Sequence, residues 1–165
     1  MPFTDNVWQP SYAGAKPLGD FSNPCGAGGA KSLRAELNSK VAILLFPAKI
    51  DQGKTFGFEF ELARDTTLEV LSNQATIVTS GKEAVLVPLQ YKGDLDIATN
   101  DPKVPYRLTG RRQYYPFEVR IDQIKANTFF LVVPIRIEGE STERTVRVRF
   151  DHRQALGYKS SCELM

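Results

Sequence analysis

Alternation of apolar and polar residues is the most regular feature of the chain. Residues 55–62 read Thr-Phe-Gly-Phe-Glu-Phe-Glu-Leu, so the large apolar side chains fall on one side of an extended strand, and Glu59 and Glu61 fall on the other. A period of two predicts a β-strand with one buried and one solvated face. The pattern returns at residues 117–122 and 146–150, which is typical of antiparallel sheet with one face in water.

The same reading along the whole chain predicts about eight strands and almost no helix. The strands are expected at residues 41–46, 56–63, 67–71, 75–78, 84–90, 114–121, 129–137 and 145–151. Residues 32–38 are expected to form one or two turns of helix, with Ser32 as the N-cap and Asn38 as the stop. No helical pattern separates consecutive strands, which argues against parallel βαβ units.

Strands at this spacing favour a sandwich or a barrel. Prolines interrupt several strand-like runs, and proline belongs at a sheet edge, a strand end or a bulge. They are Pro47, Pro88, Pro116 and Pro134. A sandwich has edges to host them, so the predicted fold class is all-β: a two-sheet antiparallel β-sandwich, immunoglobulin-like or jelly-roll-like, with an extended N-terminal arm.

The length of 165 residues suits a single domain. Residues 1–31 are rich in Pro and Gly but also carry aromatic residues such as Trp8 and Tyr12. Too many aromatics are present for a purely flexible linker. We therefore predict an extended arm over residues 1–31 that packs on the domain, and a single β-sandwich domain over residues 32–165.

Charge on the solvated faces predicts a strand pairing. Glu59 and Glu61 line one strand, and Arg147 and Arg149 line another. Opposite charges facing each other across strands contribute roughly 0.2–1 kcal/mol per pair. We expect these strands to be neighbours or to share one outer face; the alternative is two separately solvated faces.

The charge and hydropathy totals exclude some partners. The formal net charge is +2, too small for a nucleic-acid or membrane-surface footprint. No run approaches the roughly 18 apolar residues of a membrane span, and the N-terminus lacks the pattern of a signal peptide. The chain then fits a cytosolic or virion protein, or a mature form whose leader has been removed.

The positions of the two cysteines indicate in which cellular compartment the protein is expected. Cys25 and Cys162 lie in polar segments outside the expected strands, whereas free cysteines are more often found in a core. A Cys25–Cys162 disulfide would join the arm to the C-terminal tail and imply an oxidising compartment. We therefore expect a periplasmic or secreted protein, with a virion as the alternative location; two unrelated thiols are the other reading of the cysteines.

Searches for catalytic chemistry find nothing that singles out a site. Residues 26–32 resemble a phosphate-binding loop only briefly, because Cys25 and Ala30 stand where that loop needs glycine. His152 is the only histidine, and it has no evident catalytic partner or zinc-ligand set. We expect no enzyme activity and no cofactor.

An oxygen-rich loop leaves calcium open as a question. Asp94, Asp96 and Asp101 lie within eight residues, and calcium takes six to eight oxygen ligands. The spacing fits no EF-hand, however, and the alternative is a solvated loop whose carboxylates make local turn hydrogen bonds.

The strongest candidate for a binding surface is residues 106–115. Tyrosine and arginine are enriched at interface hot spots because they cover apolar area and still form hydrogen bonds. The expected partner-binding residues are Tyr106, Arg107, Arg111, Arg112 and Tyr114. The alternative is that Tyr114 begins a strand and the arginines are simply solvated. So few arginines make nucleic acid a weak partner.

The layout resembles small secreted or periplasmic bacterial sandwich proteins, some of which neutralise toxins, and small virion proteins that use an N-terminal arm. This is an analogy of fold, and fold alone does not give function. The expected function is a non-enzymatic, extracytoplasmic module that binds a partner protein, in its sharpest form an immunity or inhibitor protein. The alternative is a structural component of a virus or phage particle, and a carboxylate enzyme or sugar-binding domain ranks last.

Overall fold

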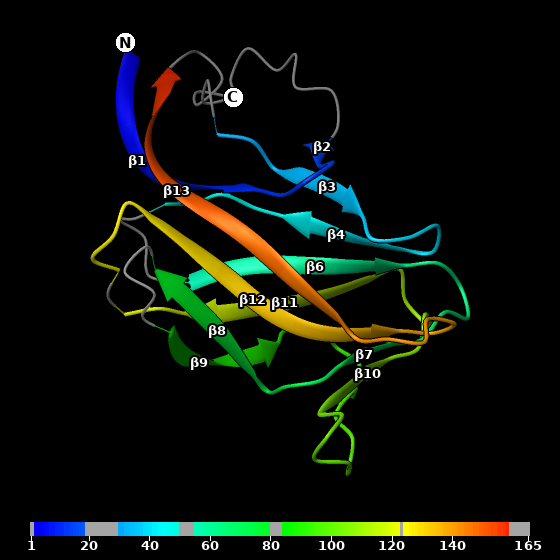
Figure 1. Ribbon diagram of the computed structural model, residues 1–165. Coiled ribbons are helices and arrows are strands. Elements are labelled where there is room, and N and C mark those ends of the chain that lie inside the picture. The colour runs from blue at the N-terminus through cyan, green and yellow to red at the C-terminus, as the bar shows by residue number, and fades with distance from the viewer. Residues whose placement is uncertain (1, 19–29, 50–54, 80–83, 123, 159–165) are drawn as a thin grey trace.

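The computed structural model describes residues 2–18, 30–49, 55–79, 84–122 and 124–158. Within these ranges the chain forms thirteen β-strands and no helix (Figure 1). The strands are β1 (Pro2–Ser11), β2 (Lys16–Pro17), β3 (Leu33–Glu36), β4 (Val41–Leu45), β5 (Ala48–Lys49), β6 (Thr55–Leu62), β7 (Leu68–Val70), β8 (Gln74–Thr79), β9 (Ala84–Tyr91), β10 (Tyr106–Leu108), β11 (Tyr114–Arg120), β12 (Thr128–Ile137) and β13 (Arg144–Tyr158). The all-β prediction is confirmed, and the expected number of strands was too low.

The strands join into one antiparallel sheet that curls into a half-barrel (Figure 1). Its order is β2-β3-β4-β6-β11-β9-β8-β12-β13-β1-β5, and β7 pairs with both β12 and β10. Strand β9 connects the two halves of the sheet, because its residues 84–88 pair with β8 and its residues 89–91 pair with β11. Since one strand belongs to both halves, the expected pair of separate sheets is not confirmed.

The core lies inside the curl, and the period-two pattern builds it. Phe56, Phe58, Phe60 and Leu62 of β6 are each at most 3% exposed, and the residues between them are half-buried. Aromatic rings join the two halves of the curled sheet: the ring centroid of Phe56 lies 5.2 Å from that of Phe129 on β12. The alternation predicted for residues 55–62 is therefore confirmed.

Part of the predicted arm is a strand of this sheet. Strand β1 pairs with β13 along its whole length, from Pro2 opposite Tyr158 to Ser11 opposite Arg149. Trp8 is buried, and its ring centroid lies 5.1 Å from that of Phe129. The N-terminal and C-terminal strands thus run side by side (Figure 1). The division of the chain at residue 31 stays a prediction.

The helix expected over residues 32–38 is wrong, because this segment contains β3. Leu33, Ala35 and Leu37 alternate with polar residues, and β3 pairs with β4. Asn38 then ends the strand with a side-chain turn: its Oδ1 accepts hydrogen bonds from the backbone N–H groups of Lys40 and Val41, both at 2.8 Å. Asparagine favours such turns, so the residue read as a helix stop is a hairpin turn.

The two charged strands are not neighbours, although both belong to the same curled sheet. Strand β6, which carries Glu59 and Glu61, pairs with β4 and β11, whereas β13 pairs with β12 and β1. Glu61 bonds instead to Arg34 of β3, and Arg147 lies over the ring of Phe130, with its guanidinium carbon 4.0 Å from the ring centroid. Exposed ion pairs contribute little to stability, so the signs of these charges do not specify which strands are neighbours.

Two predictions lie outside the described residues. Cys25 and Cys162 are there, as is most of the glycine-rich segment over residues 26–32. No helix in the described part of the chain is long and apolar enough to cross a membrane.

Candidate functional site

A hollow of about 340 Å³ lies where residues 91–98 fold back against β9 and β10. We call it the aromatic hollow. It is lined by Gln90, Tyr91, Leu95, Asp96, Ile97, Ala98 and Tyr106. Its wall is therefore mostly aromatic and aliphatic, with one carboxylate.

Glycine and a short pairing shape the loop that forms this hollow. A Cβ atom at Gly93 would overlap the hydroxyl of Tyr91, so the absence of a side chain at Gly93 lets the tyrosine ring lie against the loop. Further along, Ala98 pairs with Tyr106, and the N–H of Arg107 donates to the Ile97 carbonyl at 2.9 Å. The loop is tied to β10 through its backbone, which fixes the side chains that line the hollow.

Two tyrosines form the rigid side of the hollow. The ring centroids of Tyr91 and Tyr106 lie 5.3 and 5.5 Å from that of buried Phe117. The Tyr106 hydroxyl donates to the Leu89 carbonyl at 2.9 Å. Because both rings rest on the core, they present apolar area at little cost in side-chain entropy.

Burial acts on the ionisation of both tyrosine hydroxyls. Burial raises the pKa of Tyr91 and that of Tyr106. At Tyr91 the neighbouring Tyr115 adds to the rise in pKa, whereas a backbone hydrogen bond with Leu95 and the charge of Arg112 oppose it. The two hydroxyls are therefore hydrogen-bonding groups rather than anions at neutral pH.

The structure brings two of the five predicted partner-binding residues to this region. Tyr106 lines the hollow itself. Arg112 lies close enough for its charge to oppose the rise in the pKa of Tyr91. Its backbone N–H donates to the Tyr115 hydroxyl at 3.2 Å, and its Nη1 lies 3.8 Å from Oδ2 of Asp94. Tyr106 belongs to the aromatic wall of the hollow, and Arg112 places a cation beside Asp94.

The other three predicted residues do not gather at the hollow. Nη2 of Arg107 lies 3.1 Å from Oε2 of Glu69 on β7. Arg111 is exposed, and Tyr114, 43% exposed, stands opposite Glu61 on β6. The segment is thus split between the hollow, the β7–β10 pair and the outer face of β6.

The sequence reading missed the residues that complete the hollow. The sequence assigns no role to Tyr91, Leu95 or Ile97, because Tyr91 follows the strand expected at residues 84–90 and the other two lie among the aspartates of a loop. One signal was present, because Leu95 and Ile97 alternate with Asp94 and Asp96. Such alternation indicates that the loop turns one side inward.

The aspartates of the loop are used in turns and ion pairs. Oδ1 of Asp96 accepts from the Ala98 N–H at 3.1 Å, and Oδ1 of Asp101 accepts from the Lys103 N–H at 2.9 Å. Asp94 faces Arg112 instead. Among the described residues, no three His, Cys, Asp or Glu side chains come together as a metal ion would need.

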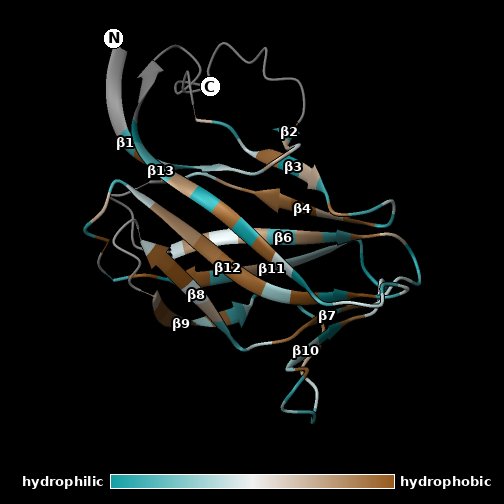
Figure 2. Ribbon diagram, viewed as in Figure 1, coloured by the Kyte–Doolittle hydropathy of each residue, from teal (hydrophilic) through white to brown (hydrophobic). Residues whose placement is uncertain are grey.

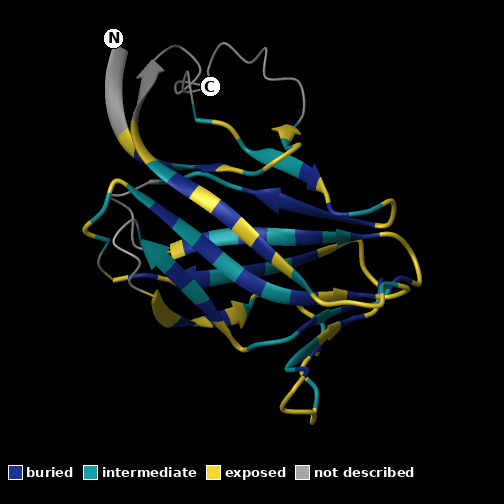
Figure 3. Ribbon diagram, in the orientation of Figure 1, coloured by how far each residue is buried: buried dark blue, intermediate teal, exposed yellow. Residues whose placement is uncertain are grey.

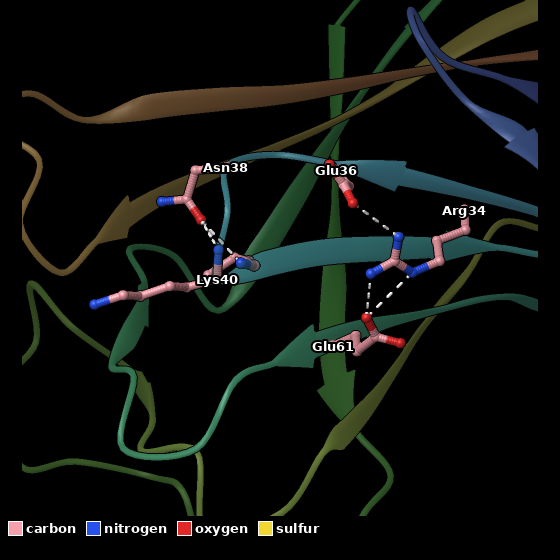
Figure 4. Close-up of polar contacts among 6 residues, drawn as sticks. Arg34, Glu36, Asn38, Lys40 and Glu61 are labelled. Carbon is pink, nitrogen blue, oxygen red and sulfur yellow. Dashed lines mark hydrogen bonds and ion pairs between the residues drawn. The ribbon is translucent and has the colours of Figure 1, made fainter.

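A second hollow, of about 140 Å³, is polar and lies between the β3–β4 turn and the end of β6. Figure 4 shows its charged wall: Nε and Nη2 of Arg34 both donate to Oε2 of Glu61, and Nη1 lies 3.4 Å from Glu36. The hydrogen bond to Glu61 raises the pKa of Arg34 further above its ordinary value. Lys40 and Asn38 line the same hollow. Its charges largely satisfy one another, which suits a structural contact.

His152 is placed against an aromatic ring rather than a nucleophile. It is exposed on β13, and its ring centroid lies 5.5 Å from that of Trp8. Asp151, its sequence neighbour, accepts a hydrogen bond from Thr128 at 2.7 Å. His152 therefore lies over Trp8 at the surface of β13.

No family model, curated protein or solved structure matches the chain.

Proposed function

We propose that the protein is a non-enzymatic module that binds a partner protein, and that the aromatic hollow receives an apolar side chain of that partner. The observation that carries the proposal is the pair of tyrosines, Tyr91 and Tyr106, held on the core at the wall of a hollow open to solvent. Hot spots of protein interfaces are pockets of this kind, enriched in tyrosine and arginine.

The shape of the hollow favours a protein over a small molecule. Small-molecule sites bury most of their ligand's surface, whereas Asp96 and Ala98 in the wall of this hollow are exposed. Its rim is charged: Asp96 lines it, and the side chain of Asp94 is 85% exposed beside Arg112. A partner with an apolar anchor residue and a neighbouring lysine or arginine would match both the wall and the rim.

The sharper form of the proposal is an extracytoplasmic immunity or inhibitor protein of all-β fold. It rests on the expected disulfide between Cys25 and Cys162. Intact-mass measurement with and without reductant tests this: blocking thiols with an alkylating agent should label neither cysteine until reductant is added. Labelling of both cysteines without reductant would remove the argument for an oxidising compartment.

The binding proposal is tested by filling the hollow. Ala98 lines it and is exposed, so Ala98→Arg places a long charged side chain over the tyrosines without removing a core contact. Ala98→Ser is the matched control. Products of neighbouring genes are tested in purified form by calorimetry: a partner that binds the native protein and Ala98→Ser should lose at least tenfold in affinity for Ala98→Arg.

Equal affinity for all three proteins would show that the hollow is not the binding site. Binding of none of the candidate partners, combined with turnover of a substrate, would overturn the non-enzymatic proposal as a whole.

A structural component of a virus or phage particle is the second candidate. The specific observation is the ribbon of β1 and β13, which puts the N-terminal and C-terminal strands side by side at one side of the half-barrel (Figure 1). Terminal segments placed together can tie subunits to one another. Light scattering of the purified protein should then show large, closed assemblies, and particles no larger than a dimer at all concentrations would contradict this candidate.

A further inference from the structure

Among the described strands, the first half of β9 has a neighbour on one side only. The N–H of Leu89 donates to Asn73 on the β8 side at 2.9 Å, and the N–H of Lys92 donates to Pro116 on the β11 side at 2.8 Å. Backbone groups alternate between the two sides of a strand, so those of Ala84 and Leu86 point away from β8. Strand β11 pairs only with residues 89–91, and no other described strand pairs with residues 84–88 on that side.

This edge lacks the usual protection against pairing. Proteins guard exposed edges with charged residues, proline or very short strands. The terminal strands of the sheet follow this rule, because β2 is Lys16–Pro17 and β5 is Ala48–Lys49. Residues 84–91 read Ala-Val-Leu-Val-Pro-Leu-Gln-Tyr, without a single charge, and the only guard is Pro88.

Large apolar side chains are exposed on both faces of the edge. Val85 is 54% exposed and Leu86 is 61% exposed, whereas Val87 is buried. Val85 shares the inner face with Val87, and Leu86 lies on the outer face with its neighbour Thr76 on β8. Figure 2 colours the first part of β9 as hydrophobic, and Figure 3 colours it as exposed. Exposed apolar area of this kind on an open edge marks an interaction site.

We propose that this edge pairs with the same edge of a second copy of the chain, antiparallel and about a two-fold axis at Leu86. Leu86 would then exchange N–H to C=O hydrogen bonds with Leu86 of the second copy. The N–H of Ala84 would donate to the carbonyl of Pro88 in that copy, which needs no N–H from the proline. Val85 would lie opposite Val87 of the second copy, so the exposed apolar side chains become buried.

A second copy fits this edge better than an unrelated protein. An isologous contact needs a surface that is complementary to itself. An uncharged apolar strand meets this requirement when it pairs antiparallel with its own copy. A different partner would need a charge pattern to be distinguished from other chains, and residues 84–91 offer none. The pairing is short, because β9 turns to β11 after Pro88, so the dimer is expected to be weak and dependent on concentration.

Sedimentation velocity over a wide concentration range tests the proposal with full-length protein. The native protein should move from the mass of one chain toward that of two. Leu86→Lys places a charge on the axis and should abolish the dimer, whereas Thr145→Lys adds the same charge at an exposed position of β13 and should leave it unchanged. Circular dichroism confirms that each variant is folded.

Amide hydrogen exchange gives a second readout that does not depend on any variant. The Leu86 amide should be exposed in dilute protein and become protected at least tenfold in concentrated protein. The Gln90 amide, which faces β11, should be protected at both concentrations. A single chain at every concentration, a dimer that survives Leu86→Lys, or an unchanged Leu86 exchange rate would each overturn the proposal.

Discussion

Nη1 of Arg144 donates a hydrogen bond to the carbonyl oxygen of Leu37 at 2.6 Å, across 107 positions of sequence. Arg144 begins β13, and Leu37 lies in the turn between β3 and β4, so the bond joins distant strands of the sheet. The same guanidinium bonds to both carboxylate oxygens of Glu140, at 2.7 and 2.8 Å. This contact ties the two halves of the half-barrel together at one end.

Arg144→Met should therefore destabilise the fold while keeping the length of the side chain. The loss is about 1 kcal/mol, because the charged hydrogen bonds are partly exposed and screened. This lowers the melting temperature by about 2–4 °C for a chain of this size. Arg120→Met is the control, since Arg120 and its partner Asp122 are both more than three-quarters exposed. Thermal unfolding of both variants measures the difference, and equal melting temperatures would contradict the role of Arg144.

The same contact predicts a dependence of stability on pH. Hydrogen bonds from Arg144 lower the pKa of Glu140 below its ordinary value of 4.5, and a hydrogen bond from Asn38 adds to this. A lowered pKa in the folded state means that the Glu140 carboxylate stabilises the fold above pH 4.5 and loses this effect as the pH falls through the folded value. The native protein should have a higher free energy of unfolding than Glu140→Gln, by a constant amount around neutral pH. This difference should become smaller below about pH 5.

Urea unfolding at a series of pH values measures this difference. In the Arg144→Met background, Glu140→Gln should lose its pH dependence, because the partner that lowers the pKa is gone. The role of the Glu140 carboxylate would be contradicted if the difference in unfolding free energy grew as the pH fell. It would also be contradicted if the pH dependence were the same without Arg144.

The effect of Glu59 on stability should depend on pH in the opposite direction. Burial raises its pKa above 4.5, and its neighbours across the strands are Leu44 and Pro116. A raised pKa in the folded state means that the charged carboxylate costs stability once the pH exceeds the folded value. Glu59→Gln should therefore be more stable than native protein at neutral pH, and the gain should vanish below about pH 4.5. Chemical unfolding at pH 7 and pH 4 measures whether Glu59→Gln is more stable than native protein at the higher pH only.

The period-two pattern could predict only what is local to the chain. It placed β6, β11 and β12 because their alternation is written in consecutive residues. It missed β1, where the two prolines Pro2 and Pro10 obscure the pattern and pairing with β13 provides the strand. It also misread Leu33–Glu36 as helix, because the partner β4 that decides the segment follows only after the turn.

The residues of the aromatic hollow could also be predicted only in part. Composition indicated Tyr106 and Arg112, since tyrosine and arginine favour interfaces. Tyr91 and Leu95 acquire a role only when the loop folds back over β9, which depends on contacts with Phe117 and β10. The strand partners of Glu61 and Arg149 were missed because register is decided by packing of the opposite faces.

Gly110 should be among the least replaceable residues of the chain. Its φ is +72°, and a Cβ there would lie 2.7 Å from the Ala63 carbonyl oxygen and 2.9 Å from the N atoms of Asp65 and Thr66. These are backbone atoms and cannot move aside cheaply. Gly110→Ala should cost about 2–3 kcal/mol, whereas Gly14→Ala, with φ of +77° and open space around its Cβ, should cost about 1 kcal/mol. Equal losses in chemical unfolding would show that the close approach of the backbone does not matter.

Gly93 makes a prediction about the aromatic hollow rather than about overall stability. A Cβ at Gly93 would overlap the end of the Tyr91 ring, and a side chain can swing away where a backbone cannot. Gly93→Ala should therefore displace Tyr91 from the wall of the hollow and expose its hydroxyl, which returns the pKa of Tyr91 toward about 10. Gly57→Ala is the control, because its Cβ would make only an ordinary contact of 3.8 Å with the Phe117 carbonyl oxygen. Spectrophotometric titration of the tyrosines should show an added group near pH 10 in Gly93→Ala alone. The same titration curve for both variants would mean that the ring of Tyr91 does not depend on the glycine.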